Sequence, residues 1–237
     1  MINGYINSIQ TLGAVDGPGV RFVAFLQGCP LNCVCCHNPE TKPLTGGTLY
    51  TAEEIVSKAE RYKEYFGKDG GITLSGGDPL TQVEFATEIL KLCKQKGIHT
   101  CVDTSGYRLD EKVKGLLKYT DLVLLDIKYT DNDSYVKYAG CGMEKPLSFL
   151  QYLEESKTPV WIRQVIIPTL NDTEENIIKL KEIVSKFACV QKTELLPFKK
   201  ICEMKYEKLG ISFPLKDIPE PNNEIMGKLN KVLQNET

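Results

Sequence analysis

The sequence lacks an excess of charge of either sign. Its 237 residues include 29 Lys and Arg against 31 Asp and Glu, which gives a net charge of -2. A protein that binds DNA or RNA draws much of its affinity from positive charge placed against the phosphates. We therefore expect no nucleic-acid partner.

Long hydrophobic runs are also missing. No stretch approaches the ~18 uninterrupted apolar residues of a membrane span. The first residues, MINGYINSIQTLG, show no basic region followed by an apolar run. We expect a cytoplasmic protein without a membrane partner.

No Ser- or Gly-rich linker and no low-complexity block divides the chain. Hydrophobic residues make up 42% of it and charged residues 25%, as in an ordinary globular protein. At about 150 residues per domain, this length allows one or two domains. We expect residues 1–237 to form a single domain.

Cysteines, by contrast, are plentiful and unevenly placed. In a reducing compartment, nine cysteines indicate metal binding or chemistry rather than disulfides. Cys29, Cys33 and Cys36 lie within eight residues at C-x3-C-x2-C spacing, with Cys35 between the last two. The other five are scattered, and we interpret them as small buried hydrophobes or partly exposed thiols: Cys93, Cys101, Cys141, Cys189 and Cys202.

The three spaced thiols can converge on one metal centre, and soft sulfur ligands select zinc, copper or iron-sulfur clusters. A cluster of four irons normally takes four cysteines, so three leave one iron open to bind substrate. Two alternatives stay open. One is a zinc ion with His37 as fourth ligand, although adjacent ligands on one backbone are geometrically awkward; the other is chance clustering without a metal.

Short runs of branched apolar residues alternate with longer amphipathic segments, a pattern typical of β/α units. The expected strands are residues 20–27, 71–75, 99–104, 122–128, 160–167 and 190–196. The expected helices are residues 51–66, 82–96, 110–118, most of 131–156, 173–187 and a last one after Pro221. Six such units favour an α/β fold with one parallel sheet and helices on its outside, either an open sheet or a partial barrel.

Polar residues gather where these strands end. They are Gly76, Gly77 and Asp78, then Asp103 and Thr104, then Asp126 and Lys128, and finally Arg163. In parallel α/β proteins, ligands bind at the carboxyl ends of the strands. We expect the active site there.

Each of these polar groups also has a plainer interpretation. The Gly-Gly-Asp segment could be only a turn. Asp126 and Lys128, two apart on a strand and so on one face, could simply pair with each other. Asp16, in the segment VDGPGVR, could be a turn residue that caps its own loop.

Several longer blocks follow one another in a characteristic order. They are TLGAVDGPGVRFVAFLQGCPLNCVCCHNPET, GGITLSGGDPL, KGIHTCVDTSG, TDLVLLDIK, VWIRQVIIP and TELLPF. With these blocks, the sequence resembles the radical S-adenosylmethionine enzymes, and among them the activases of glycyl-radical enzymes, over nearly its whole length. The resemblance implies an incomplete parallel (β/α)6 barrel, a partial TIM barrel opened at one side so that a peptide can enter.

The resemblance also implies the cofactors. Cys29, Cys33 and Cys36 would hold a [4Fe-4S] cluster whose open iron binds S-adenosylmethionine, and one electron would cleave this ligand to methionine and a 5'-deoxyadenosyl radical. The adenine would lie along Cys35, Cys36 and His37, mainly against their backbone groups. Cys35 departs from the family pattern, which has an aromatic residue there, and could serve as a replacement ligand.

Further ligand contacts are implied at the strand ends. Gly77 and Asp78 match the motif that receives the methionine amino group, with Asp in place of Glu. Asp126, Ile127 and Lys128 belong to the same ligand site, where Lys128 would reach the carboxylate or the ribose. Arg163 would orient the ligand or the peptide, and Lys199 stands where the family has a histidine.

Two more sites follow from the resemblance. Asp103, Thr104, Asp126 and the Leu124 carbonyl would form a small monovalent-cation site. Asp16, together with Arg163, would contact the substrate loop of a partner protein.

The resemblance implies pyruvate formate-lyase as the partner, a flavodoxin or ferredoxin as electron donor, and a monomer. Residues 38–50 contain no cysteine, so we expect one cluster. The alternatives are an activase of another glycyl-radical enzyme such as an anaerobic ribonucleotide reductase, a radical enzyme acting on a small molecule, and a non-enzymatic metal-binding module.

Overall fold

The computed structural model describes residues 2–234, and its strands form one sheet in the order β3-β1-β2-β4-β5-β6-β7-β8. Six strands pair in parallel in the order of the chain: β2 (Arg21–Leu26), β4 (Gly71–Gly76), β5 (His99–Thr104), β6 (Leu122–Asp126), β7 (Val160–Ile166) and β8 (Val190–Pro197). These are the six strands expected from the sequence, and their existence is confirmed.

The strand order distinguishes between the two architectures that the pattern left open. A doubly wound sheet reverses direction at a switch point, whereas here each parallel strand joins the same growing edge. Right-handed crossovers in one direction place all helices on one face and curve the sheet into a barrel. Because β3 and β8 are the two outer strands of the sheet, the barrel is incomplete, as predicted.

Two strands at one edge were not expected. β1 (Asn3–Gly13) pairs antiparallel with β2, and β3 (Thr48–Thr51) pairs antiparallel with β1. Much of β1 is polar and half-exposed. The sequence therefore shows little of the apolar run that identified the buried parallel strands.

The helices follow the expected pattern with three differences, the first of which is a short helix at residues 203–208 that was not expected. Their bounds are α1 (Ala52–Glu60), α2 (Val83–Gln95), α3 (Glu111–Leu117), α4 (Asn132–Ala139), α5 (Glu144–Glu155), α6 (Glu174–Val184), α7 (Glu203–Lys208) and α8 (Asn223–Gln234). α1 begins with a capping box between Thr51 and Glu54 but ends six residues earlier than expected. The segment expected to be mostly helical is two helices, because Gly140 adopts a left-handed conformation at φ 83° and ends α4.

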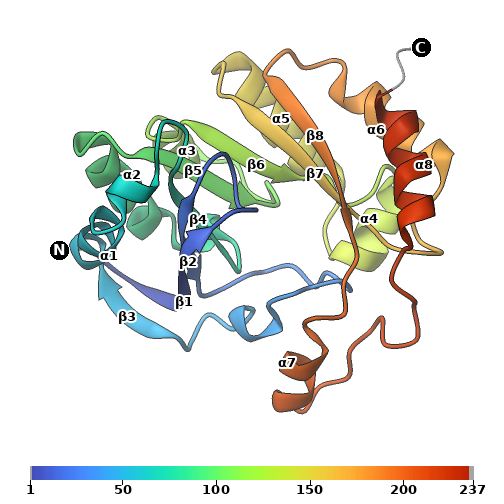
Figure 1. Cartoon of the computed structure of the whole chain (residues 1–237), viewed down its shortest axis with the longest axis horizontal. Coiled ribbons are helices and arrows are strands. Elements are labelled where there is room, and N and C mark those ends of the chain that lie inside the picture. The colour runs from blue at the N-terminus through green and yellow to red at the C-terminus, as the bar shows by residue number, and fades with distance from the viewer. Residues whose placement is uncertain (1, 235–237) are drawn as a thin grey trace.

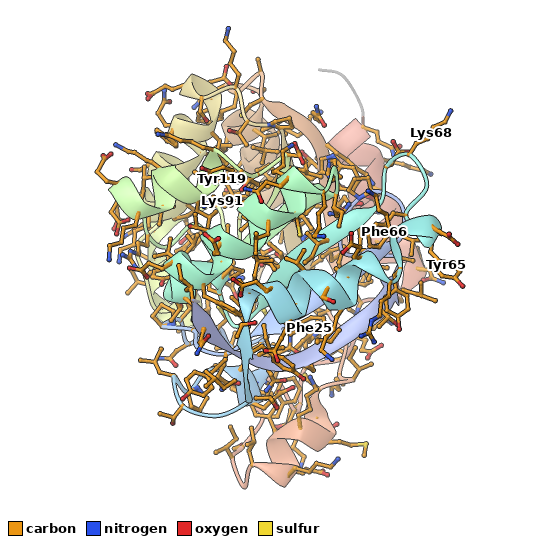
Figure 2. All side chains as sticks on the ribbon, turned by 90° about the vertical axis from the view of Figure 1, so that its left-hand side faces the viewer. Phe25, Tyr65, Phe66, Lys68, Lys91 and Tyr119 are labelled. Carbon is orange, nitrogen blue, oxygen red and sulfur yellow. The ribbon has the colours of Figure 1, made fainter. Side chains whose placement is uncertain are left out.

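The main core lies between the outer face of the sheet and the helices. Ile72, Leu74, Val102, Val123 and Leu125 from the central strands are fully buried in it. Figure 1 shows α1 and α2 near the end of the curved sheet that carries β1 and β3, and α6 and α8 near the end that carries β8. On the face of α1 and α2, drawn in Figure 2, charged side chains such as Lys68 extend away from the ribbon.

The opposite face of the same strands lines the inside of the barrel. Side chains alternate across a strand, so the residues between the core positions point inward. Cys101, Leu122 and Leu124 form a small apolar cluster there with Trp161. Toward the carboxyl ends of the strands, the inward side chains become polar, and this change creates the site described below.

A C-terminal segment that carries α7 lies beyond β8. Figure 1 shows it extending away from the strands and helices of the barrel. Phe198, Tyr206 and Phe213 form a second apolar cluster, against which Val34 and Cys35 of the cysteine loop pack. The sequence pattern did not indicate this contact. Among the described residues, no helix has the length and apolar character that crossing a bilayer requires.

Candidate active site

A cavity of about 460 Å³ opens at the carboxyl ends of the parallel strands. Each parallel strand contributes at least one inward side chain to its wall: Phe25, Ser75, Asp103, Asp126, Arg163 and Leu196. Cys29, Cys33, Cys35 and Cys36 line the same cavity. The structure therefore brings the cysteine motif and the strand-end polar residues together, as the sequence predicted.

The cysteine loop is held by its backbone. The N–H groups of Asn32 and Val34 donate to the carbonyls of Ala139 and Tyr138 at the end of α4, at 3.1 and 2.9 Å. The last carbonyls of a helix have no partner within the helix, so these bonds satisfy both elements. The loop conformation around Cys33 is thus fixed by a helix more than 100 residues later.

The thiols of the motif are poorly solvated. Burial raises the pKa of Cys29 to about 12, and the nearby Asp78 carboxylate adds to this shift. Burial also raises the pKa of Cys36 above its ordinary value. Metals bind cysteine as the thiolate, so a cationic metal centre that binds here must displace the thiol protons of Cys29 and Cys36.

The donor set fits an iron-sulfur cluster. Three soft sulfur ligands from one loop line one cavity, and thiolates are the ligands that iron-sulfur clusters take. Within residues 2–234, no three His, Cys, Asp or Glu side chains converge as the ligands of a single metal ion.

The Gly-Gly-Asp turn after β4 packs closely against the cysteine loop. The N–H of Gly77 donates to the Leu26 carbonyl and that of Asp78 to the Gly28 carbonyl, both at 2.9 Å. A Cβ atom on Gly77 would lie 2.2 Å from the Gly28 oxygen. Only glycine permits this approach, so the turn is more than a surface connection.

The side chain of Asp78 faces away from solvent and is 1% exposed. Its carboxylate accepts hydrogen bonds from the Thr104 and Ser105 hydroxyls and from the N–H groups of Leu80 and Ser105. Burial raises the pKa of Asp78, although these hydrogen bonds oppose the shift. Asp78 therefore fixes the loops after β4 and β5 relative to each other.

An ion network crosses the cavity wall. Arg163 contacts Asp103 at 2.5 Å and Asp126 at 3.5 Å, and the Lys128 ammonium contacts Asp126 at 2.9 Å. The Ser75 hydroxyl donates to Asp103 at 2.7 Å. Asp126 and Lys128 do pair with each other, as the plainer interpretation has it, but in the wall of the cavity rather than apart from it.

The network keeps its members charged. Burial alone would lower the pKa of Lys128, but the Asp126 carboxylate holds it well above its usual range. Burial would likewise raise the pKa of Asp126, but Lys128 and Arg163 hold it below its ordinary value. The site thus presents a fixed ammonium and guanidinium beside the thiols, a setting that suits a ligand carboxylate.

Comparison with known proteins agrees with this geometry. Residues 23–180, more than half of the chain, match the Radical SAM superfamily. Pyruvate formate-lyase-activating enzyme of Clostridium pasteurianum is 48% identical over 235 residues, which cover 99% of this chain and 98% of that protein. The corresponding enzyme of Listeria monocytogenes is 39% identical over 238 residues, covering 98% and 96%.

This chain belongs to the radical SAM superfamily. Within it, the chain belongs to the family of the pyruvate formate-lyase-activating enzymes. A radical SAM methyltransferase from Sphaerobacter thermophilus superposes with a TM-score of 0.67 at 17% identity, covering 90% of this chain and 63% of that one, and so shares the fold. The predicted family, the enzyme class and the cofactors, a [4Fe-4S] cluster and S-adenosylmethionine, are confirmed by this membership.

Superfamily membership leaves the individual residues to be placed by the structure. Asp103, Thr104 and Asp126 of the predicted cation site line the cavity, but Leu124 does not. The Thr104 hydroxyl donates to Asp78, and the Arg163 guanidinium contacts both Asp103 and Asp126. The cation site stays a prediction.

Of three further predicted ligand contacts, His37, Lys199 and Ile127, His37 alone lines the cavity. The His37 ring lines the cavity and bonds the Lys199 carbonyl at 3.0 Å, and burial lowers the pKa of His37. The Lys199 ammonium pairs with Glu220 at 2.8 Å on the surface, and Lys199 does not line the cavity but contacts it only through the bond of its carbonyl to His37. Ile127 is fully buried, and its N–H donates to the Arg163 carbonyl.

Asp16 lines the cavity from the loop between β1 and β2. Burial raises the pKa of its carboxyl, and repulsion from Asp103 adds to the shift. The Thr73 hydroxyl donates to its carbonyl at 2.7 Å and holds the loop against β4.

Sequence reasoning missed several residues of the site. Gln10, Val15, Leu31 and Ile201 line the cavity, and Tyr206 reaches the cysteine loop from α7. α7 has only six residues, too few for a periodic signal. The one available hint was the aromatic-rich composition of the segment after β8.

Proposed function

We propose that this protein activates pyruvate formate-lyase by generating a radical on one of its glycines. The observation that carries the proposal is the single cavity that holds the cysteine motif, the Gly77 turn and the Lys128 network. The relatives that match nearly the full length of the chain bear the name of this activity.

Cys29, Cys33 and Cys36 would hold the [4Fe-4S] cluster through their sulfur atoms. When bound and reduced, the cluster supplies the electron that cleaves S-adenosylmethionine to methionine and a 5'-deoxyadenosyl radical, which takes a hydrogen atom from glycine. The remaining residues of the cavity would bind and orient S-adenosylmethionine and would exclude water.

The methionine end of S-adenosylmethionine would meet the strand-end residues. A contact between Gly77 and the ligand ammonium would use the Gly77 carbonyl, because an ammonium only donates hydrogen bonds and needs an acceptor. Lys128 would receive the ligand carboxylate, since its ammonium lines the cavity and is held in place by Asp126. Arg163 would keep both Asp103 and Asp126 in position, and Asp78 would hold the turn.

The adenine would lie along the backbone of Cys35, Cys36 and His37, with Ile127 supporting the wall behind Arg163. A monovalent cation bound by Asp103, Thr104, Asp126 and the Leu124 carbonyl remains part of the proposal.

Selectivity would come from position. The radical attacks most C–H bonds, so one hydrogen must be held within near-attack distance while water is excluded. Glycine lets a loop approach closely because it has no side chain. Asp16 would bind this loop, and Val15 and Ile201, which are 79% and 78% exposed and line the same cavity, offer apolar contacts at its opening.

A flavodoxin or ferredoxin would supply the electron, and the protein would act as a monomer. Both statements rest on the family resemblance.

The decisive assay combines anaerobically reconstituted and reduced enzyme, S-adenosylmethionine and pyruvate formate-lyase. We expect a glycyl-radical signal in electron paramagnetic resonance, with a changed splitting when the glycine carries α-deuterium, and deuterium in the 5'-deoxyadenosine. If 5'-deoxyadenosine forms without a partner radical or deuterium transfer, the proposal is wrong and the substrate is another molecule. Cys189→Ala, on a thiol outside the cavity, serves as the control variant.

A further inference from the structure

A second, much smaller chamber adjoins the active-site cavity. Its volume is about 10 Å³, and it is lined by Cys35, Asp126, Lys128, Tyr129, Arg163, Val165 and Ile167. Five of these residues also line the main cavity, so only a layer of side chains separates the two spaces.

Two buried polar atoms at this chamber have no hydrogen-bond partner among residues 2–234, the part of the chain that the structure describes. They are the Tyr129 hydroxyl and Nε of Arg163, in residues that are 2% and 8% exposed. Native proteins seldom leave buried donors unpaired, because each would forfeit its hydrogen bonds to water without compensation. Both atoms belong to side chains that wall the same chamber, so one bound molecule could satisfy both.

Asp126 supplies a third polar partner. Its Oδ1 lies 3.5 Å from Arg163 Nε, too far for a good direct hydrogen bond. A molecule that accepts from Nε and donates to the carboxylate would bridge this gap. Val165 and Ile167 close the remaining wall with apolar surface.

We propose that this chamber binds one ordered water molecule, which accepts from Arg163 Nε, exchanges a hydrogen bond with the Tyr129 hydroxyl and donates to Asp126. The volume matches the ~10–15 Å³ that a single water needs, and three partners lie within the usual two to four. Through this water, Tyr129 acts as a positioning residue for Arg163 and Asp126.

A consequence for ligand binding rests on the proposed function. Asp126 also contacts Lys128 at 2.9 Å, so the water would help to hold the ammonium that we assign to the ligand carboxylate. Removing the Tyr129 hydroxyl should therefore weaken S-adenosylmethionine binding without disturbing the cysteine ligands.

The test begins with a high-resolution crystal structure of the full chain, prepared anaerobically without S-adenosylmethionine. We expect a single peak of water density within ~3.2 Å of Tyr129 Oη and Arg163 Nε. An empty chamber, or a peak with the density and contacts of an ion, overturns the water site. Because no ligand is present, this result does not depend on the proposed function.

Tyr129→Phe then tests the positioning role. The ring, which packs edge-to-face on Tyr135 at 6.1 Å, is retained. We expect the water peak to disappear, affinity for S-adenosylmethionine to fall ~2- to 10-fold, and iron and sulfide content to stay unchanged. Tyr138→Phe is the matched control, because its ring lies 5.4 Å from that of Tyr129 but outside the chamber. Equal affinity in Tyr129→Phe and wild type overturns the positioning role.

Discussion

The hydroxyl of Tyr206 donates a hydrogen bond of 3.1 Å to the carbonyl of Cys36, 170 residues earlier in the chain. Tyr206 is 3% exposed, and its ring packs on Phe213 at a centroid distance of 4.8 Å. Lys205 next to it contacts Asn38 and Glu40 just beyond the motif. The segment around α7 therefore holds the last cysteine of the motif from outside the barrel.

Tyr206→Phe should loosen this end of the cysteine loop. The Cys36 carbonyl loses its partner while the aromatic packing stays, so the free energy of unfolding should fall by about 1–2 kcal/mol. Urea denaturation measures this change, and the visible absorbance of the cluster should also decay faster in air. Tyr65→Phe, at a residue that is 62% exposed, should alter neither quantity. Equal cluster lifetimes in the two variants would show that α7 does not support the loop.

Gly77→Ala should damage the active site. The added methyl group would meet the Gly28 carbonyl at 2.2 Å, and because this contact is backbone, the turn and the cysteine loop must move apart. We expect cluster content and S-adenosylmethionine affinity to drop together, as measured by iron analysis and equilibrium binding. Gly115→Ala in α3 meets nothing within 4 Å and should instead stabilise the protein by ~0.5–1 kcal/mol.

Cys29, Cys33 and Cys36 should each be indispensable for the cluster. After anaerobic reconstitution, the wild type should hold about four iron and four sulfide per chain. Replacing any one of the three by Ala should abolish the iron absorption, because two ligand thiols cannot retain the cluster, whereas iron absorption kept in one variant would indicate that Cys35 replaces the lost ligand. Cys189→Ala should keep it, since this residue does not line the cavity. Stoichiometric zinc without iron absorption would contradict the assignment.

Asp16→Asn should change stability in a pH-dependent way. A carboxyl whose folded pKa is raised by burial and by Asp103 stabilises the fold fully below its unfolded pKa of ~3.9, and this contribution is lost as the pH rises through the folded pKa. At neutral pH the charged Asp16 carboxylate therefore destabilises the fold, and the Asn variant should be more stable than the wild type. The gain should shrink as the pH falls toward ~4. Urea denaturation at several pH values measures it.

The same variant separates stability from function. We expect Asp16→Asn to lower the yield of partner radical while iron content and S-adenosylmethionine binding stay near those of the wild type. A stability gain of equal size at every pH would show that the carboxyl charge is not the cause.

Local pattern was enough to predict the six parallel strands. Runs such as residues 122–125 are apolar at every position, as expected of a strand that is covered on both faces. β1 and β3 were not predicted, because strands that are partly exposed to solvent have mixed composition. The strand-end side chains were predicted to meet because parallel strands end at the same edge of a sheet, and Asp78, Asp103, Asp126 and Arg163 do so.

Three features follow from the order of residues along the chain alone: the cysteine motif, the alternation of strands and helices, and the inward face that carries Asp126, Lys128 and Arg163. Each of these depends only on spacing and periodicity. Only the tertiary structure decided what each loop side chain contacts. Lys199 turns to Glu220 and offers its carbonyl to His37, and Tyr206 reaches Cys36 from 170 residues away. Loops follow no period, so their side chains are placed by packing between distant segments, which no local pattern encodes.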